Sequence, residues 1–297
     1  MRRRPGPALT VALVATLWGT VGVLVREVDL PAVAIVAGRV WLAAAALGVW
    51  LAVRDVPGAR LLAHRPGRTV VAGVVLAGHW VALVEALQRA PIGTVLLLTY
   101  LSPVLVAAAA PSTLGEVVPR TTVVALGLGV AGMALVVLPG GGGGPGDGPA
   151  GVALAVVAGA SLAVLTILSK PLSEGYGGVR LAFLEMAVAG VALLPVAAVA
   201  DWGPPRGTWL WLVVLGVVHS GAAVAVYLGA LARLPATSVG ILAYLEPVSA
   251  VLFGWLLLSE SPHPATVAGG ALILVAGGLV ARAGAPVPSP EVAGAAR

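Results

Sequence analysis

Long runs of apolar residues, separated by short polar or Pro/Gly segments, occupy most of the 297-residue sequence. The hydrocarbon core of a bilayer is about 30 Å thick, and an α-helix needs about 20 apolar residues to cross it. Ten runs approach this length, at residues 8–25, 32–53, 69–88, 92–110, 121–138, 150–169, 179–199, 208–231, 236–258 and 265–282. The pattern therefore predicts an all-α polytopic membrane protein with ten transmembrane helices.

The composition agrees with a membrane protein and excludes several other classes. Hydrophobic residues make up 59% of the chain and charged residues only 10%, with a mean hydropathy of +1.04, whereas a soluble domain carries about 25% charged residues. An ordinary cytosolic enzyme, a disordered chain and a nucleic-acid-binding protein are therefore excluded. The chain has no cysteine and four histidines, so we expect no metal site.

The positive residues set the expected orientation. With a cytoplasmic N-terminus and ten alternating spans, 13 of the 17 Lys and Arg residues fall in cytoplasmic segments, three fall outside, and Arg39 lies within a span. This excess matches the positive-inside rule. The apolar run after Arg2-Arg3-Arg4 is long and lacks a clear cleavage site, which favours a first helix over a signal peptide. We expect a multi-pass protein of a bacterial plasma membrane with both termini in the cytoplasm.

A shift of 144 residues aligns the two halves of the chain. Residues 86–104 then match residues 230–248 at ten of nineteen positions, including an arginine, two prolines and a tyrosine. The same shift aligns Glu116 with Glu260. Each half contains five predicted helices, an odd number, so the second half enters the membrane from the opposite face. Such inverted-topology repeats are typical of transporters with a substrate site between the halves.

The repeat divides the chain into four predicted parts. The first five-helix repeat covers residues 8–138 and the second covers residues 150–282. Residues 139–149 form a linker rich in glycine and proline, which is flexible by composition. Residues 283–297 form a flexible cytoplasmic tail.

Several features together resemble the EamA type of the drug/metabolite transporter superfamily. They are the five-plus-five helix pattern, Trp18-Gly19 in the first helix, Arg39 in the second, the Ala-Leu-x-Arg-x-Pro turn, and a proline in helices four and nine with a glutamate after each. The resemblance covers about residues 8 to 282. It implies a secondary transporter without a bound cofactor, often an exporter of amino acids or other small amphipathic metabolites.

Glu246 is the principal candidate for binding a substrate ammonium or a coupling proton, the alternative being a packing role. It lies about eleven residues from the inner end of its span, or ~16 Å deep. Pro247 deprives the carbonyl of Ala243 of its helical partner, and Pro103 does the same to Thr99. Matched spans interrupted by proline in the two halves point to a binding site.

The repeat extends this candidate site to neighbouring positions. Ser102 is the neutral counterpart of Glu246 in the first half, and Tyr100 and Tyr244 precede these two positions by two residues. We expect both tyrosines to line the cavity together with Trp18.

Arg39 and Glu185 occupy related places in the two halves. Arg39 lies ~12 Å deep and is a candidate clamp for a substrate carboxylate, unless it extends to the outer headgroups or pairs with Glu85. Glu185 is expected to act as a gate or as a structural partner of Lys170 or Arg180.

Three further features involve ionisable side chains. His79 and His219 lie in the middle of helices three and eight, where each either binds a proton or substrate or forms a packing hydrogen bond. Glu85 and Arg89, four residues apart, are expected to form an ion pair at a helix end.

The function expected from these residues is secondary active export of small amino-acid-like metabolites by alternating access. Arg39 and Glu246 would hold the two ends of a zwitterion, with or without proton coupling. The alternative is a multidrug exporter of lipophilic cations that uses Glu246 alone. A polytopic membrane enzyme is disfavoured because no Asp lies inside a span, and we assign no catalytic residue. The expected partners are a small-molecule substrate and the lipid bilayer, not nucleic acid, and both a monomer and a homodimer remain open.

Overall fold

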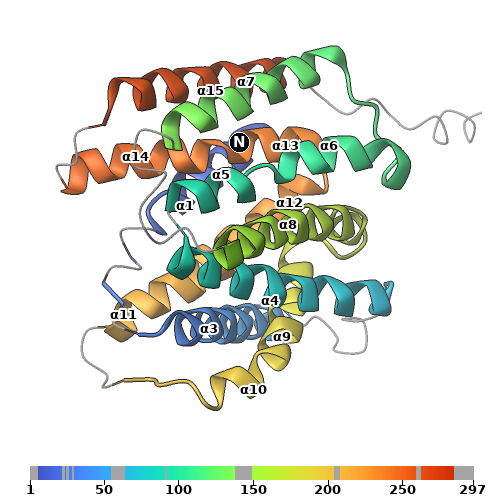
Figure 1. Cartoon of the computed structure of the whole chain (residues 1–297). Coiled ribbons are helices and arrows are strands. Elements are labelled where there is room, and N and C mark those ends of the chain that lie inside the picture. Colours follow the sequence, from blue (N-terminus) through green and yellow to red (C-terminus); the bar gives the residue numbers. More distant parts are fainter. Residues whose placement is uncertain are drawn as a thin grey trace, which may run out of the picture.

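The computed structural model describes residues 6–21, 24, 27, 28, 30–54, 64–90, 92–137, 149–203, 208–258 and 262–283, and every regular element in this part is helical (Figure 1). In chain order the elements are α1 (Pro7–Trp18), α3 (Ala32–Val53), α4 (Pro66–Arg89), α5 (Ile92–Thr99), α6 (Ser102–Thr113), α7 (Arg120–Val137), α8 (Pro149–Tyr176), α9 (Gly178–Ala192), α10 (Leu194–Ala197), α11 (Thr208–Val213), the π-helix η3 (Val214–Ala222), α12 (Ala223–Leu231), α13 (Ala236–Ala243), α14 (Leu245–Leu258) and α15 (Pro264–Ala283). The linker predicted over 139–149 lies outside the described residues except for Pro149, and the predicted tail lies outside them except for Ala283.

Eight helical segments in the described part are long and apolar enough to cross a membrane. They correspond to α3, α4, α5 with α6, α7, α8, α11 with η3 and α12, α13 with α14, and α15. The all-helical, polytopic character predicted from the sequence is thereby confirmed. The number ten stays a prediction because α1 and α9, with 12 and 15 residues, are shorter.

The outward faces of these helices are apolar. Leu13, Val74, Val123 and Val156 each expose half or more of their surface. Such side chains need no cover in hydrocarbon, where the backbone polar groups must instead be paired within the protein. The helices therefore present the surface that a lipid bilayer requires.

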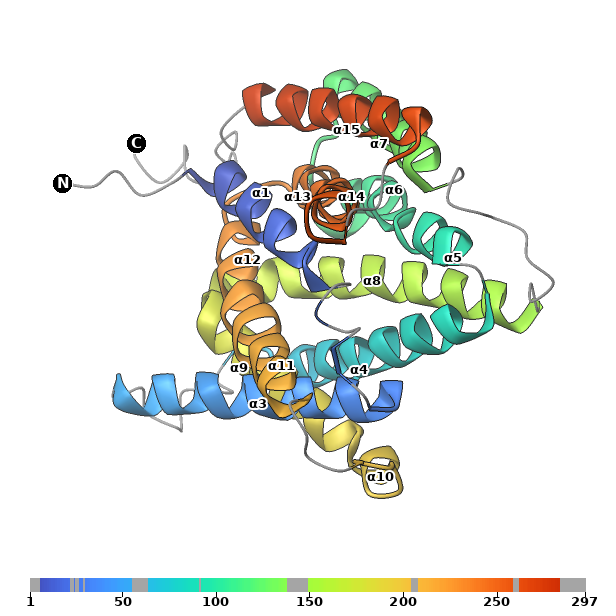
Figure 2. The ribbon, with the colours of Figure 1, turned by 90° about the vertical axis from the view of Figure 1, so that its left-hand side faces the viewer.

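The helices pack in successive layers, as the two perpendicular views show (Figures 1 and 2). α7 and α15 lie side by side at one edge, next to α6, α13 and α14. α8 lies along α4 and contacts α5 and α6, and α3 packs against α9 and η3 on the far side. The layers surround a central region bounded by both halves of the chain.

Glycines allow α7 and α15 to approach closely. A Cβ atom added to Gly132 would lie 2.6 Å from the Gly269 carbonyl oxygen, and one added to Gly269 would meet the Gly132 carbonyl. Small residues permit this close backbone approach between membrane helices. The two glycine-rich helices therefore pack against each other within the chain.

Pro171 lies inside α8 and removes the N–H that would bond the carbonyl of Ile167. Arg68 of α4 supplies the missing donor: its Nη2 donates to the Ile167 carbonyl at 2.7 Å, and its Nε donates to Leu168 at 3.2 Å. The side chain thus satisfies a backbone acceptor that Pro171 deprives of its helical donor. It also fixes α4 against α8, two helices that face the central region.

Glu116 joins the two halves of the chain. It follows α6, and its carboxylate accepts a bifurcated hydrogen bond from the Ala236 N–H at the start of α13, at 2.8 and 3.0 Å. A carboxylate near the N-terminus of a helix pairs with free N–H groups there. Burial raises the pKa of the Glu116 carboxyl, and the Ala236 N–H counteracts this rise.

Replacing Gly132 with alanine should destabilise the protein, because the added methyl group would overlap the Gly269 carbonyl. Overpacking of this kind costs about 1–3 kcal/mol. Gly127→Ala on the same helix is the matched control, since a Cβ there meets nothing within 4 Å. The midpoint of thermal unfolding in detergent micelles should fall for Gly132→Ala alone; equal midpoints would show that α7 and α15 do not approach as described.

Candidate functional site

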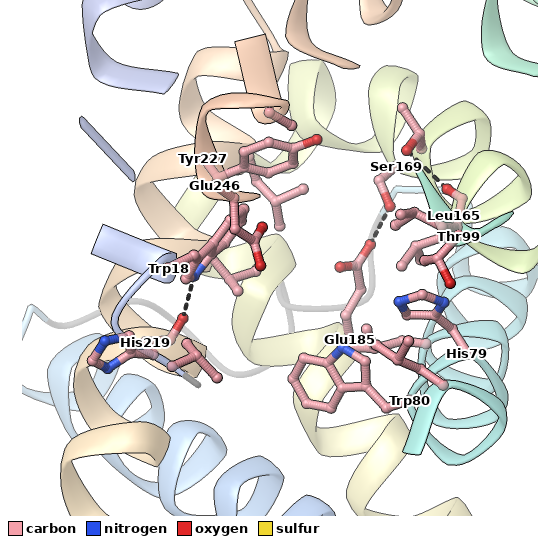
Figure 3. Close-up of a pocket in the computed structure, with 18 of the residues that line it drawn as sticks. Trp18, His79, Trp80, Thr99, Leu165, Ser169, Glu185, His219, Tyr227 and Glu246 are labelled. Atoms are coloured by element: carbon pink, nitrogen blue, oxygen red, sulfur yellow. Dashed lines mark hydrogen bonds between the residues drawn. The ribbon is translucent and has the colours of Figure 1, made fainter. Parts of the chain in front are cut away.

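A cavity of about 280 Å³ lies at the centre of the helices. Both halves of the chain line it: α1, α3, α4 and α5 contribute from the first, and α8, α9, η3, α12, α13 and α14 contribute from the second. Its wall is mostly apolar, with a few polar and charged groups that converge on the hollow (Figure 3). That combination is typical of small-molecule sites.

Seven of the candidate residues named from the sequence line this cavity: Trp18, Arg39, His79, Tyr100, Glu185, His219 and Glu246. The other five are absent from its wall: Glu85, Ser102, Pro103, Tyr244 and Pro247. The sequence therefore located most of the charged and aromatic groups that meet at the centre. It did not distinguish these cavity-lining groups from candidate residues that lie outside the wall.

Arg39 and Glu246 face the same cavity without forming an ion pair. Within the described residues, the ion pairs shorter than 4 Å are Glu85–Arg89 and Lys170–Glu174. Arg39 is instead held by neutral groups: its Nε donates to Ser220 Oγ at 3.0 Å, and its guanidinium lies 5.0 Å from the centroid of the Trp80 ring. A cation over a tryptophan face is stabilised electrostatically without being neutralised.

The π-helix η3 positions Ser220, whose hydroxyl accepts the hydrogen bond from Arg39. Ser220 Oγ donates to the carbonyl of Leu215, five residues earlier, at 2.9 Å. His219 likewise places Nδ1 3.3 Å from the Val214 carbonyl. Because π-helices occur often at functional sites, this local departure from α-helical geometry agrees with the position of the cavity.

Two histidines occupy opposite walls of the cavity (Figure 3). His79 Nδ1 lies 2.9 Å from the Ala158 carbonyl; since a carbonyl only accepts, Nδ1 carries the proton and Nε2 is the acceptor in the neutral ring. His219 Nε2 lies 2.9 Å from Thr20 Oγ1, and the His219 carbonyl accepts from Trp18 Nε1 at 3.0 Å. Both imidazoles thus also join neighbouring helices.

Glu246 lies in the first turn of α14, beside two phenols. The Tyr100 side chain lies near its carboxylate. Tyr227 of α12 lies near Glu246 and also near Glu185. The positive end of the α14 dipole further favours a negative charge at this position.

The two proline-interrupted spans break where the sequence predicts. α5 ends at Thr99 and α6 begins at Ser102, and α13 ends at Ala243 and α14 begins at Leu245. Thr99 and Ala243 line the cavity at these breaks. Irregular backbone at membrane depth is tolerated where it is buried in protein or lines such a hollow.

Tyr244 connects the two breaks and does not line the cavity. Its side chain is fully buried, and its hydroxyl donates to the carbonyl of Tyr100 at 2.9 Å. Tyr100 and Tyr244 are the residues aligned by the internal repeat, and their ring centroids are 6.1 Å apart. The expectation that both line the cavity is therefore corrected: Tyr100 faces the hollow, and Tyr244 satisfies the carbonyl behind it.

Two expected partners of the acidic residues differ from those observed. Glu185 accepts a hydrogen bond from Ser169 Oγ at 2.6 Å, whereas Lys170 pairs with Glu174 at 2.7 Å. The predicted pairing of Glu185 with Lys170 or Arg180 is wrong because Ser169 occupies the face of α8 that meets α9. Glu85 pairs with Arg89 at 2.6 Å, as expected, and therefore not with Arg39.

Sequence reasoning missed several neutral residues of the wall. They are Trp80, Thr166, Ser169, Tyr227 and Thr99, of which the sequence analysis considered only the carbonyl. Hydroxyl and aromatic groups do not stand out in an apolar span as a charge does. The spacing of Thr166 and Ser169, three residues apart, was the one available signal, because it places both on one face of a helix.

Comparisons with known proteins show which sequences and structures this chain resembles. The model of the EamA-like transporter family matches the chain twice, over residues 6–138 and 149–282. An "Uncharacterized transporter" of Archaeoglobus fulgidus is 30% identical over 272 residues, which cover 91% of this chain and 94% of that protein. The "Pseudopaline exporter CntI" of Pseudomonas aeruginosa PAO1 is 29% identical over 280 residues, covering 90% and 93%.

A solved structure titled "Crystal structure of protein" has a TM-score of 0.80 to this chain at 22% identity. The match covers 93% of this chain and 98% of that one. At this identity the likeness establishes the shared fold.

Removing the Tyr244 hydroxyl should destabilise the protein without changing the cavity wall directly. Tyr244→Phe leaves the buried Tyr100 carbonyl without its donor, and an unsatisfied buried group costs about 1–3 kcal/mol. Tyr227→Phe is the matched control, because the Tyr227 hydroxyl forms no hydrogen bond shorter than 3.5 Å with the described residues and the Tyr244 bond to Tyr100 is kept. Thermal unfolding in detergent should show the lower midpoint for Tyr244→Phe, and the reverse order would contradict the assigned roles.

Proposed function

The chain belongs to the EamA-like transporter family, and we propose that it is a secondary active exporter of small, amphipathic, amino-acid-like metabolites. Membership establishes a multi-pass membrane transporter of a small-molecule substrate. The substrate class, the direction and the mechanism are the proposal. Support for export includes the name of one relative, the pseudopaline exporter of Pseudomonas aeruginosa.

The observation that carries the proposal is the separation of Arg39 from Glu246 across one cavity. Buried charges are costly unless they are paired, and here each lacks an opposite charge within 4 Å among the described residues. A zwitterion supplies both missing partners at once. Its carboxylate suits the forked donors of the arginine, and its ammonium suits Glu246.

We propose that the chain has ten spans in two inverted repeats, residues 8–138 and 150–282, which rock about the cavity. Two features support this symmetry. The family model matches each half, and contacts between the halves occur in equivalent pairs. The contact of α4 with α9 is equivalent to that of η3 with α3, and the contacts of α8 with α5 and α6 are equivalent to those of α1 with α13 and α14. The excess of Lys and Arg in alternate connections supports cytoplasmic termini in a bacterial plasma membrane.

Glu246 also provides a mechanism for coupling to protons. An ionised carboxylate at membrane depth is expensive, so either a substrate ammonium or a proton neutralises it. Because the two compete for one group, release of the substrate on one side favours proton binding there. Exchange of substrate for protons follows.

Export of lipophilic cations is the second candidate, favoured by the aromatic wall. Trp18, Trp80 and Tyr227 line the cavity, and aromatic faces attract cations. In this alternative Arg39 has no role in binding, because a cation brings no carboxylate to it.

Transport into proteoliposomes distinguishes the two functions. Arg39→Ala should reduce transport of a zwitterionic amino acid at least tenfold, since removing one member of a buried charge pair costs about 2–5 kcal/mol. Glu246→Gln should reduce it as much and abolish its dependence on a proton gradient. Arg89→Ala, which breaks an exposed ion pair, is the control and should keep the wild-type rate.

The same vesicles test the alternative with a lipophilic cation. If Arg39→Ala leaves cation transport intact while wild-type protein moves no zwitterion, the protein is a cation exporter. If Glu246→Gln moves its zwitterion at the wild-type rate with the wild-type proton dependence, the role assigned to Glu246 is wrong.

A further inference from the structure

Glu185 is a second buried carboxylate in the wall of the cavity, on the side opposite Glu246 (Figure 3). It is 2% exposed, and its observed hydrogen bond comes from the neutral Ser169. No Lys, Arg or His within the described ranges forms an ion pair with it. A buried carboxylate in this position needs a countercharge from elsewhere.

Two neutral residues with hydroxyl groups, Thr99 and Thr166, also line the cavity. Thr99 is 4% exposed, and its hydroxyl has no hydrogen-bond partner among the residues that the structure describes. Thr166, one turn before Ser169, donates its hydroxyl hydrogen to the Leu162 carbonyl at 2.9 Å, which leaves its lone pairs available. Figure 3 shows Thr99, Ser169 and Glu185 on one side of the hollow.

These groups match the requirements of an ammonium ion. An ammonium has three N–H donors and no acceptor, and this wall offers a carboxylate and two hydroxyl oxygens. The unpartnered Thr99 hydroxyl is the independent sign of a ligand, because a buried polar group without a partner is unfavourable unless something binds it. We propose that Glu185, Thr99 and Thr166 form a second cation subsite.

The charge balance of the cavity then defines the substrate class. With both histidines neutral, Arg39 contributes one positive charge, and Glu246 and Glu185 contribute two negative charges. A molecule with one carboxylate and two cationic nitrogens compensates all three. The preferred substrate is therefore a basic amino acid or a conjugate of one, and this inference rests on the exporter function proposed above.

The size of the cavity is compatible with such a molecule. The volume of the cavity is about 280 Å³. This is close to the lower end of small-molecule sites, which fits a single amino acid better than a large lipophilic drug.

L-lysine and L-norleucine are suitable probes because they differ only in the ε-ammonium group. Transport of each into proteoliposomes should show at least a tenfold preference of the wild-type protein for lysine. Glu185→Gln should abolish the preference, which is measured as the ratio of the lysine rate to the norleucine rate. Glu85→Gln removes a carboxylate that lies outside the cavity wall, in an ion pair at the end of α4, and as the control it should keep the preference.

Thr99→Val tests the same subsite without loss of a hydrogen bond within the protein, since the Thr99 hydroxyl has no partner to lose. It should fold normally, with an unchanged or higher midpoint of thermal unfolding, and should weaken the preference for lysine several-fold. An unchanged preference in both Thr99→Val and Glu185→Gln would overturn the subsite.

The remaining outcomes separate the two proposals. If wild-type protein moves norleucine as well as lysine, the exporter function stands and the second subsite is refuted. If Glu185→Gln instead removes the proton dependence of norleucine transport, Glu185 is a proton site and the subsite is likewise refuted. If neither amino acid is transported, the exporter function and the subsite both fail.

Discussion

Opposite charges buried among membrane helices normally pair with each other, and here Arg39 and Glu246 are held apart on one cavity. The arrangement depends on what holds Arg39: Ser220, which η3 presents, and the Trp80 ring below the guanidinium. Both anchors are neutral, so they fix the position of the cation without compensating its charge. In the proposed function, a ligand of complementary charge offsets the free-energy cost of burying these two charges.

Side chains pair with part of the irregular backbone around the cavity. Proline interrupts two spans beside the cavity, and Tyr244 donates to the carbonyl freed near the first break. A third proline interrupts α8, and Arg68 pairs with the carbonyl it frees. Glycine contacts between α7 and α15 join the two halves at the edge.

The sequence predicted the positions of the helices along the chain better than the directions of their side chains. Apolar run length located α3 at Ala32–Val53 and the combined helix from Thr208 to Leu231 at the predicted bounds, because the cost of burying polar residues in hydrocarbon is read directly from composition. Rotation about a helix axis was not predictable, since most faces of a buried span are apolar. Tyr244 and Glu185 show this: each was placed in a predicted span, but its hydrogen-bond partner was not predicted. The π-helix of η3 had no sequence signal, because its residues are equally suited to an α-helix.

A structure determined with a bound zwitterionic amino acid would show whether Arg39 and Glu246 hold the two ends of the substrate. We expect ligand density in the cavity, with the carboxylate within hydrogen-bond distance of the Arg39 guanidinium and the α-ammonium beside the Glu246 carboxylate. A ligand bound elsewhere, or a direct contact between Arg39 and Glu246 in the occupied protein, would contradict it.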